Sequence, residues 1–538
     1  MLKPYEPPVF GTVDQMIFDE LVRRDHWVRR AEKHVDFLGL RKAVEEFYNA
    51  DWGCPGVEPV LLIKLELILF HDNLSDAQLW KRVETDMAYR WFLGLGLTDH
   101  LPDKSTISRF RGRIGADGFG QLFDALLSQA RQHGLIRDRL RIKDATHVIA
   151  DIAVPAGLTL VAQARNRLLR NQGLNTVDAF GAIQRRRSDQ RFTANTPCVR
   201  DAEPFDELRV AGERVKIDTI RTSTDSQADD TRLVARIEHL RDILAWTAEL
   251  QPPTDADTNP TWQKLAQSRD IARRTLAGHD DPQAGDKLRS VSDPDARRGK
   301  HGDYYDGYFV DVLIDADSEL FTAINVLPAS GNESVDTLTL VTHETETHGN
   351  TIESLSIDGA GFDGPVLREL EDEHDIDVFV PPKQTTPANR FGPEDFEVSE
   401  DGKYATCPAG ERSQYRQREE SRHGTSYRFD GDVCQQCPLF QNCIGKTQKH
   451  GRTVRVSDYA PEYARVRERA TTPEYASVRQ EHPAVERRLG HLMNRYGGRR
   501  ARYRGHARVK GQELMGAITH NVARLIRLLD SRTTFAFA

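Results

Sequence analysis

The sequence has no run of about eighteen or more apolar residues, the length a helix needs to cross a bilayer. Its first residues, Met1 to Tyr5, also lack the basic-then-apolar order of a signal peptide. Cysteine is scarce, with 6 among 538 residues. We therefore expect a protein without membrane contact that stays in the cytoplasm, where disulfides are rare.

The chain also lacks a net positive charge, because its formal net charge is −8. Taken as an average, this value argues against a nucleic-acid partner. The charge is unevenly distributed, however, since residues 446–538 contain 20 Lys and Arg against 8 Asp and Glu. A basic C-terminal segment on an acidic body is typical of a protein that binds nucleic acid.

The apolar spacing changes along the chain and predicts several parts. Helical spacing predicts an all-helical N-terminal domain over residues 1–136, in which Ser75 caps a helix. Alternating segments then predict strands at 140–151, 304–315, 320–327, 354–357 and 376–380, with helices at 335–348 and 365–372. This order predicts an α/β fold with a mixed sheet, built from 137–160 and 300–384, and a polar helical insertion over 161–299.

Asp144 is unusual within its predicted strand. Period-two alternation places Ile142, Asp144 and Thr146 on one face, so the carboxylate shares a face with an apolar side chain. Burying a carboxylate is costly unless a cation or a hydrogen-bond donor accompanies it. An edge strand with a solvated aspartate is the alternative interpretation.

Asp358 directly follows the predicted strand at 354–357, at the carboxyl end where open α/β sheets bind ligands. If its strand neighbours that of Asp144, the two carboxylates meet and repel each other, and a shared proton or a divalent cation relieves the repulsion. Mg²⁺ prefers such hard oxygen ligands. A third carboxylate would come from the basic C-terminal part at 456–538.

Two arginine-rich helices are candidate DNA contacts. The first follows Ser105 and carries Arg109, Arg111 and Arg113; its alternative is an ordinary solvated amphipathic helix. The second surrounds Glu486, and its alternative is a salt-bridged surface helix. Its arginines are Arg487, Arg488, Arg495, Arg499, Arg500, Arg502 and Arg504.

Four cysteines in the segment 385–455 predict a metal module. They are Cys407, Cys434, Cys437 and Cys443, with one C-x2-C pair among them. Four thiolates suit tetrahedral Zn²⁺, and a full set of protein ligands indicates a structural role. Incidental thiols are the alternative. We expect Cys54 and Cys198 to be unliganded and His147 to be a hydrogen-bonded structural residue.

Several motifs together resemble those of insertion-sequence transposases of the DDE type. The motifs are Asp144-Ala145-Thr146-His147-Val148, Tyr305-Asp306-Gly307-Tyr308, Asp358-Gly359-Ala360-Gly361-Phe362, His482 to Gly490 and Gly498 to Gly505. The resemblance extends from the helical N-terminal domain to Asn521. It implies a ribonuclease-H-like catalytic core with Asp144, Asp358 and Glu486 as an acidic triad that binds two Mg²⁺ or Mn²⁺ ions.

The match around Glu486 departs from the family pattern. Relatives often carry a basic residue at a set distance after the glutamate, whereas Met493 stands seven residues after Glu486 and the nearest basic residue is Arg495. Glu481 and Glu474 therefore compete for the third position.

The resemblance implies an enzyme that cleaves the ends of a DNA element and joins the freed 3′-hydroxyl to target DNA. Its partners would be the terminal repeats of the element and the target DNA, bound by a homodimer. Two alternatives remain open: a DNA-binding regulator whose acidic site has decayed, and a nuclease of the same fold that cuts without joining.

Overall fold

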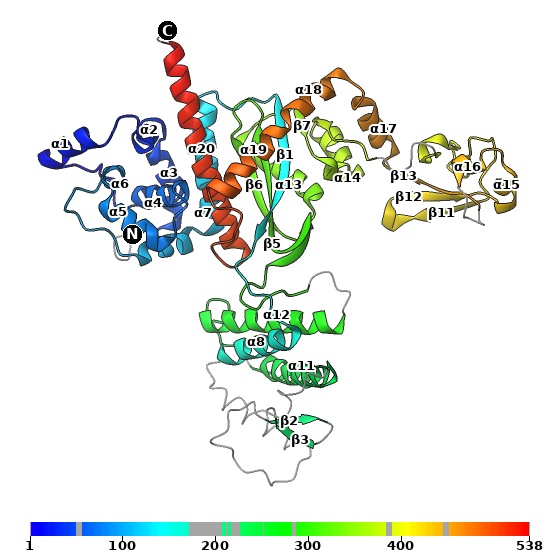
Figure 1. Ribbon diagram of the computed structural model, residues 1–538, viewed down its shortest axis with the longest axis horizontal. Coiled ribbons are helices and arrows are strands. Elements are labelled where there is room, and N and C mark those ends of the chain that lie inside the picture. The colour runs from blue at the N-terminus through cyan, green and yellow to red at the C-terminus, as the bar shows by residue number, and fades with distance from the viewer. Residues whose placement is uncertain are drawn as a thin grey trace.

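The computed structural model describes residues 2–49, 56–171, 207–210, 213–216, 226–250, 252–281, 287–383, 390–444 and 451–536. Cys54 and Cys198 lie outside these ranges. Figure 1 shows a central sheet with the N-terminal helices on one side, a small β-rich module on the other, and a helical insertion below.

Seven helices form the N-terminal part: α1 (Thr12–Leu21), α2 (Trp27–His34), α3 (Phe37–Ala43), α4 (Pro59–His71), α5 (Asp76–Thr85), α6 (Met87–Leu93) and α7 (Ser105–Gln132). Ser75 caps α5 as the sequence predicts, because its side chain accepts a hydrogen bond from the backbone of Gln78 in a capping box. Helix α4 is buried along almost its whole length. It is therefore an internal helix around which the others pack.

The central sheet contains β1 (Leu140–Ile149), β4 (Arg297–His301), β5 (Asp303–Asp315), β6 (Phe321–Pro328), β7 (Ser354–Ser356) and β8 (Asp377–Phe379). Strand β5 pairs antiparallel with β1, β4 and β6. On the other side of β1, β7 and then β8 run parallel to it. The sheet is therefore mixed, as the sequence predicts.

Gly307 on β5 lies opposite Ile149 at the far end of β1. A Cβ atom at this position would come within 2.0 Å of the carbonyl oxygen of Val148. Only glycine therefore allows this close approach of the two strands.

Strand β1 buries charged residues on the face opposite Asp144. Arg141 forms ion pairs with Asp315 (3.0 Å) and Glu344 (2.5 Å), and Lys143 forms one with Asp311 (2.9 Å). The side chains of all these residues are at most 2% exposed. Alternation along β1 did not predict this network, because the partners come from β5 and from α13 (Glu333–His348).

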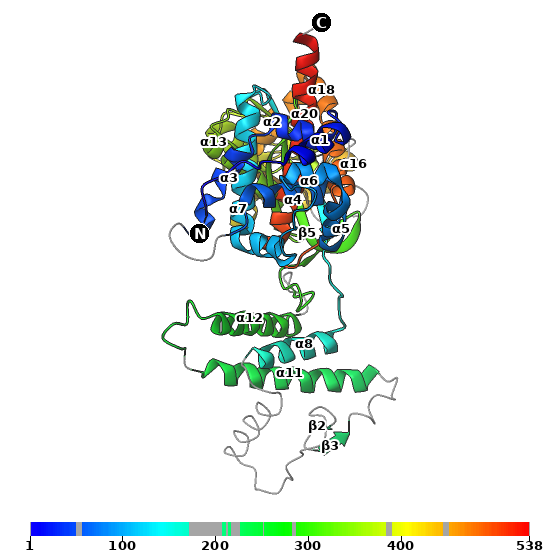
Figure 2. The ribbon, with the colours of Figure 1, turned by 90° about the vertical axis from the view of Figure 1, so that its left-hand side faces the viewer.

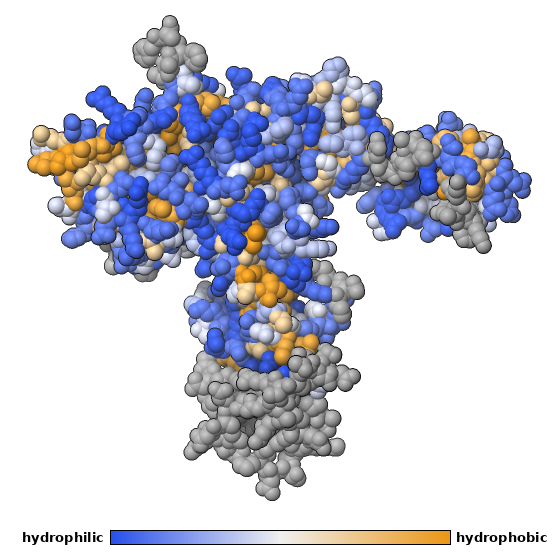
Figure 3. All heavy atoms as spheres, viewed as in Figure 1, coloured by the Kyte–Doolittle hydropathy of each residue, from blue (hydrophilic) through white to orange (hydrophobic). Residues whose placement is uncertain are grey.

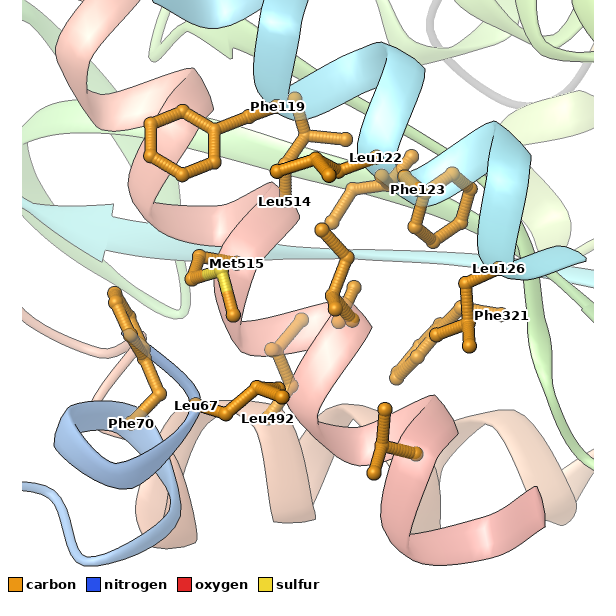
Figure 4. Close-up of a cluster of buried hydrophobic side chains, with 14 of the residues drawn as sticks. Leu67, Phe70, Phe119, Leu122, Phe123, Leu126, Phe321, Leu492, Leu514 and Met515 are labelled. Atoms are coloured by element: carbon orange, nitrogen blue, oxygen red, sulfur yellow. The ribbon is translucent and has the colours of Figure 1, made fainter. Parts of the chain in front are cut away.

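One hydrophobic core joins the two ends of the chain to one face of the sheet. The long C-terminal helix α20 (His506–Ala536) packs on α4, α7 and β6. Figure 4 shows side chains from these elements, and Leu492 from the turn His491–Arg495, meeting in the core: Leu67, Phe70, Phe119, Leu122, Phe123, Leu126, Phe321, Leu492, Leu514 and Met515. The N-terminal helices and the sheet therefore share a single core.

A second core covers the other face of the sheet, where α13 and α14 (Gly364–Arg368) pack on β5, β6, β7 and β8. Helix α17 (Ala460–Arg469) also contributes Val466 to this core. The sheet is thus covered by helices on both faces.

The insertion between β1 and β4 has a core of its own. It contains α8 (Gly157–Arg170), α11 (Ser226–Ala248) and α12 (Pro260–Asp280), together with the short strands β2 (Glu207–Val210) and β3 (Glu213–Lys216). Figures 1 and 2 show from two directions that it lies outside the body of the protein.

The small module on the other side of the sheet contains the cysteines. Its strands are β9 (Glu397–Val398), β10 (Ala405–Thr406), β11 (Tyr415–Glu419), β12 (Gly424–Arg428) and β13 (Thr453–Ser457), and its helices are α15 (Gly431–Gln436) and α16 (Phe440–Cys443). The chain then continues through α17, α18 (Pro473–Glu481) and α19 (Pro483–Gly490) back to the sheet.

Apolar side chains gather on the surface at the N-terminal end, over α1 (Figure 3). They include Val9, Val13, Met16 and Leu21, which are 57–91% exposed. Among the described residues, no helix combines the length and the apolar character that crossing a membrane requires.

Candidate active site

The register of the two parallel strands aligns Asp144 with Asp358. Ile142 on β1 pairs with Ser356 on β7, and each aspartate lies two residues further along its own chain. Because the strands are parallel, both carboxylates lie at the same level of the sheet and at the same edge. The structure therefore brings together the two aspartates that the sequence singles out.

Glu486 reaches the same place from α19, which packs against β1. Burial raises the pKa of Asp144 to about 6, and the negative charges of Asp358 and Glu486 add to this rise. The backbone N–H of Ala145, 2.8 Å from Asp144 Oδ1, and the ammonium of Lys143 oppose it. Asp144 therefore lies in a cluster of three carboxylates that repel one another.

The competing glutamates lie elsewhere. Glu481 forms an ion pair with Arg139 at 2.8 Å, and Glu474 is exposed in the first turn of α18. Neither is among the charges that shift the pKa of Asp144. Of the three candidates, Glu486 is the one that the fold couples to the aspartates.

Two residues on the segment before Glu486 support the end of β7. Arg479 donates hydrogen bonds from Nη1 to Ser356 Oγ (3.1 Å) and to the carbonyl oxygen of Ile357 (2.8 Å). His482 Nδ1 lies 3.0 Å from the same Ser356 hydroxyl, and burial lowers the pKa of its imidazole to about 4. These contacts fix the strand that precedes Asp358.

Sequence reasoning missed Arg479, although it stands seven residues before Glu486, a spacing that returns to the same side of a helix. Burial lowers the pKa of Arg479, and the charges of Asp358, Glu486 and Asp144 are among those that oppose this shift. Arg479 is therefore a cation close to all three carboxylates.

Glu333, the first residue of α13, was also missed. Burial raises the pKa of Glu333, while Lys143 lowers it and Asp358 raises it further. Glu333 is thus an additional carboxylate on the Lys143 side of Asp358. A glutamate at a helix start is common in any sequence, so it carries no signal for this position.

Two segments of the chain match families of known proteins. Residues 16–113 match a transposase domain family (DUF772), and residues 406–526 match the transposase DDE domain family. Together, the two matches support an insertion-sequence transposase of the DDE type. The second match includes Glu486. It begins after β1, which carries Asp144, and after Asp358, which follows β7. No curated protein and no solved structure shows a significant match to the chain.

The arginines of the transposase divide into two groups. The first group contacts the protein itself. Arg111 is 13% exposed and pairs with the buried Glu66 (2.6 Å) and with Asp76 (2.8 Å). Arg499 donates to Thr146 Oγ1 (3.1 Å) and to the carbonyl oxygen of His147 (2.7 Å), which ties it to β1.

Arg502 and Arg488 also belong to this first group. Arg502 donates to the carbonyl oxygen of Leu74 and to Asn73, and Arg488, 11% exposed, pairs with Glu319. The guanidinium groups of all four arginines bind other residues of the protein, although Arg499 and Arg502 are only partly buried. The structure therefore gives these four arginines a role within the fold, as an alternative to the predicted DNA contacts.

The second group faces solvent. Arg109, Arg487 and Arg504 have side chains that are 70%, 58% and 51% exposed, and Arg495 and Arg500 are also exposed. Their ion pairs with Asp103, Glu319 and Asp151 lie at 3.3–3.4 Å on the surface, where such pairs contribute little to stability. The Arg113 guanidinium lies 4.4 Å from the ring centroid of Tyr48.

A groove of about 640 Å³ runs between the start of α5 and the segment 493–503. Arg499, Arg500 and Arg502 contribute to its wall on one side, and Asn73 and Ser75 on the other. The groove therefore joins the N-terminal helices to the arginine-rich segment that follows Glu486.

The four predicted zinc ligands of the transposase line one cavity. Cys407 follows β10, Cys434 lies on α15, Cys437 caps it, and Cys443 ends α16. All four are free thiols. Burial raises the pKa values of Cys434 and Cys443, and the other cysteines of the set raise them further. Four thiols that line one cavity, in a module with a very small apolar core, match the donor set of structural zinc.

His147 points away from the carboxylates. Its ring lies 4.9 Å from that of Tyr305 and 5.1 Å from that of His301, and burial lowers the pKa of its imidazole. The prediction of a hydrogen-bonded histidine is not matched at Nδ1, which is buried and without a hydrogen-bond partner in the described structure.

Proposed function

We propose that this transposase cleaves the ends of a DNA element and joins the freed 3′-hydroxyl to target DNA. The order of the sheet supports a ribonuclease-H-like core, because three antiparallel strands (β1, β5, β6) are followed by two strands (β7, β8) parallel to the first. Asp144 lies in the middle of β1, level with Asp358 just past the carboxyl end of β7, and α19 lies beside β1.

The convergence of three carboxylates carries the proposal. The negative charges of Asp358 and Glu486 raise the pKa of Asp144, and divalent cations relieve such repulsion. The three residues would hold two Mg²⁺ or Mn²⁺ ions. When bound, such a pair activates the attacking oxygen and stabilises the leaving oxygen of a phosphodiester.

Other residues of the chain prepare the site for DNA. Arg479 holds the end of β7 in place and supplies a positive charge beside the carboxylates. Glu486 is exposed, so DNA can reach this edge of the sheet. The exposed arginines Arg109, Arg487, Arg495, Arg500 and Arg504 would bind DNA phosphates, together with Arg113, which shares α7 with Arg109. The groove beside α5 would give the DNA backbone a path that contacts both the N-terminal helices and the arginine-rich segment after Glu486.

The cysteine module would hold one structural Zn²⁺ through Cys407, Cys434, Cys437 and Cys443. The partners in this proposal are the terminal repeats of the element and the target DNA. A homodimer on DNA follows from the reaction, because two element ends must be held together for joining.

The test is Mg²⁺-dependent cleavage and joining of a labelled element end by the wild type and by Asp144→Asn, Asp358→Asn, Glu486→Gln and Glu481→Gln. We expect the first three variants to bind the end and to lose joining, while Glu481→Gln keeps it. Full joining by folded Asp144→Asn and Asp358→Asn would overturn the proposal. Cutting without joining by the wild type indicates a nuclease, and binding without cutting indicates a regulator.

A further inference from the structure

A separate group of metal-binding side chains joins α7 to α13. Asp124 lies on α7, and His343 and His348 lie on α13, which packs beside it. The Nε2 atoms of both histidines lie 3.1 Å from Oδ1 of Asp124. This group is distinct from the three carboxylates, because none of its members is among the charges that shift the pKa of Asp144.

Among the described residues, this is the one group of three or more His, Cys, Asp or Glu side chains whose ligand atoms all lie within 4.8 Å of one another. Ligands at about 2.0–2.1 Å around a tetrahedral ion lie about 3.3 Å apart. The observed nitrogen-to-oxygen distances of 3.1 Å are close to this value. An ion between the three atoms therefore requires only small shifts of the side chains.

The surroundings of the group favour a cation. His348 is the last residue of α13, and Gly349 follows it in the left-handed conformation with a φ of 61°. The last carbonyl groups of a helix carry a partial negative charge, which attracts positive charge to this end. The side chain of His348 is 4% exposed, whereas that of His343 is 41% exposed. Solvent ions can therefore reach the group from the His343 side.

The second nitrogen of one imidazole is also engaged. His343 Nδ1 lies 3.3 Å from Thr347 Oγ1. Metal-binding histidines usually use their second nitrogen in this way, which fixes the ring and leaves Nε2 for the ion. Two protonated imidazoles bound to Asp124 without an ion would account for the same distances, and the two explanations differ in metal content.

We propose that Asp124, His343 and His348 bind a divalent transition-metal ion, with Zn²⁺ as its probe, and that this ion ties α7 to the end of α13. Two imidazole nitrogens and one carboxylate oxygen are the ligands of zinc sites that leave a fourth position for water, and imidazole selects against Mg²⁺. Because α7 shares its core with the N-terminal helices and α13 packs on the sheet, the ion fixes these two parts against each other.

The test measures bound zinc in the full chain without DNA, after dialysis against Zn²⁺. It compares the wild type, His348→Ala and the control His100→Ala, which removes an exposed histidine that follows α6. The cysteine module is intact in all three, so zinc held there cancels in the comparison. We expect one ion fewer per chain in His348→Ala than in the other two proteins.

The same proteins are melted with and without Zn²⁺. Because a ligand that binds the folded state stabilises it, Zn²⁺ should raise the melting temperature of the wild type and of His100→Ala by several degrees more than that of His348→Ala. Equal zinc content and equal shifts in all three proteins overturn the proposal and leave a hydrogen-bonded cluster without an ion.

If His348→Ala fails to fold, Asp124→Asn replaces it in both measurements. The amide keeps the size and hydrogen-bonding capacity of the carboxylate but is a poor zinc ligand. We expect this variant to melt near the zinc-free wild type and to bind one ion fewer per chain. Undiminished zinc binding by folded Asp124→Asn contradicts the proposal.

Discussion

The two faces of β1 carry charge in opposite ways. On one face Arg141 and Lys143 are buried, and each is paired with carboxylates of neighbouring elements. On the other face Asp144 lies beside Asp358 and Glu486, so that like charges meet. We call the face with Arg141 and Lys143 the balanced face, because its ion pairs contribute to the fold. On the face with Asp144, the negative charges repel one another, and a bound cation can relieve this repulsion. The burial of a charged residue alone does not distinguish a stabilising position from a repulsive one. The sign of the charges on the neighbouring residues does.

The largest expected effect comes from Asp144→Asn. Joining should fall by about 10³-fold or more, since a ligand for the metal ions is lost. The pKa of Asp144 is raised in the folded state, so its ionised form destabilises the protein above about pH 6. At pH 8 without divalent metal the variant should therefore be more stable than the wild type by about 1–2 kcal/mol.

Chemical unfolding monitored at the core, together with the joining assay, checks this prediction. The gain in stability should disappear below pH 4, where the carboxyl group is protonated in both folded and unfolded chains. A variant that is less stable at pH 8 would show that Asp144 is not repelled by its neighbours.

Removing a charge from the face with Arg141 and Lys143 should lower the stability of the protein. Asp311→Asn leaves the Lys143 ammonium buried without its partner, which costs about 3–5 kcal/mol of stability. The loss of joining in this variant should follow the loss of folded protein. The double variant Lys143→Met/Asp311→Leu is the control, because replacing both charges with apolar groups should restore most of the stability. Circular dichroism during thermal unfolding measures both effects.

Glu513 on α20 provides a third case, a buried carboxyl group that keeps its proton. Burial raises its pKa to about 8, while Arg502 and Gln512 oppose this rise. The unfolded chain releases this proton at a lower pH, so the wild type should lose stability relative to Glu513→Gln as the pH rises from 5 to 8. The difference should be on the order of 1 kcal/mol per pH unit. Equal pH profiles of the two proteins would contradict the prediction.

The smallest effects should come from the exposed arginines. Arg500→Ala should weaken binding to an element end, and to unrelated DNA, by a similar factor and reduce the salt dependence of binding by about one charge. Arg111→Ala should instead lower stability, because it leaves the buried Glu66 unpaired. Binding measured at several salt concentrations, beside thermal unfolding, separates the two kinds of arginine.

The sequence was sufficient for features that rest on local pattern. Alternation located β1 and β5, the segment before Asp358 was correctly predicted as a strand, and Ser75 was correctly predicted as a helix cap. The family resemblance, and not periodicity, selected Glu486. Its position beside β1 depends on how α19 returns to the sheet after the cysteine module, which no local pattern encodes.

The features that were missed depend on contacts between distant segments. Arg141 and Lys143 looked like ordinary polar positions until β5 and α13 supplied their partners. Arg111 appeared to be a DNA contact because its partner Glu66 lies within the apolar run of α4. Asp124 and the two histidines are more than 200 residues apart in the sequence. Their proximity is a property of the packing of α7 against α13.

The shared core has a consequence for the synthesis of the protein. Helix α20 leaves the ribosome after its partners α4 and α7, which precede it by several hundred residues. Contacts between such distant segments form late in folding. The chain therefore cannot complete this core until α20 has been synthesised. A gene copy truncated before α20 therefore encodes a product whose core stays open beside α4, α7 and β6.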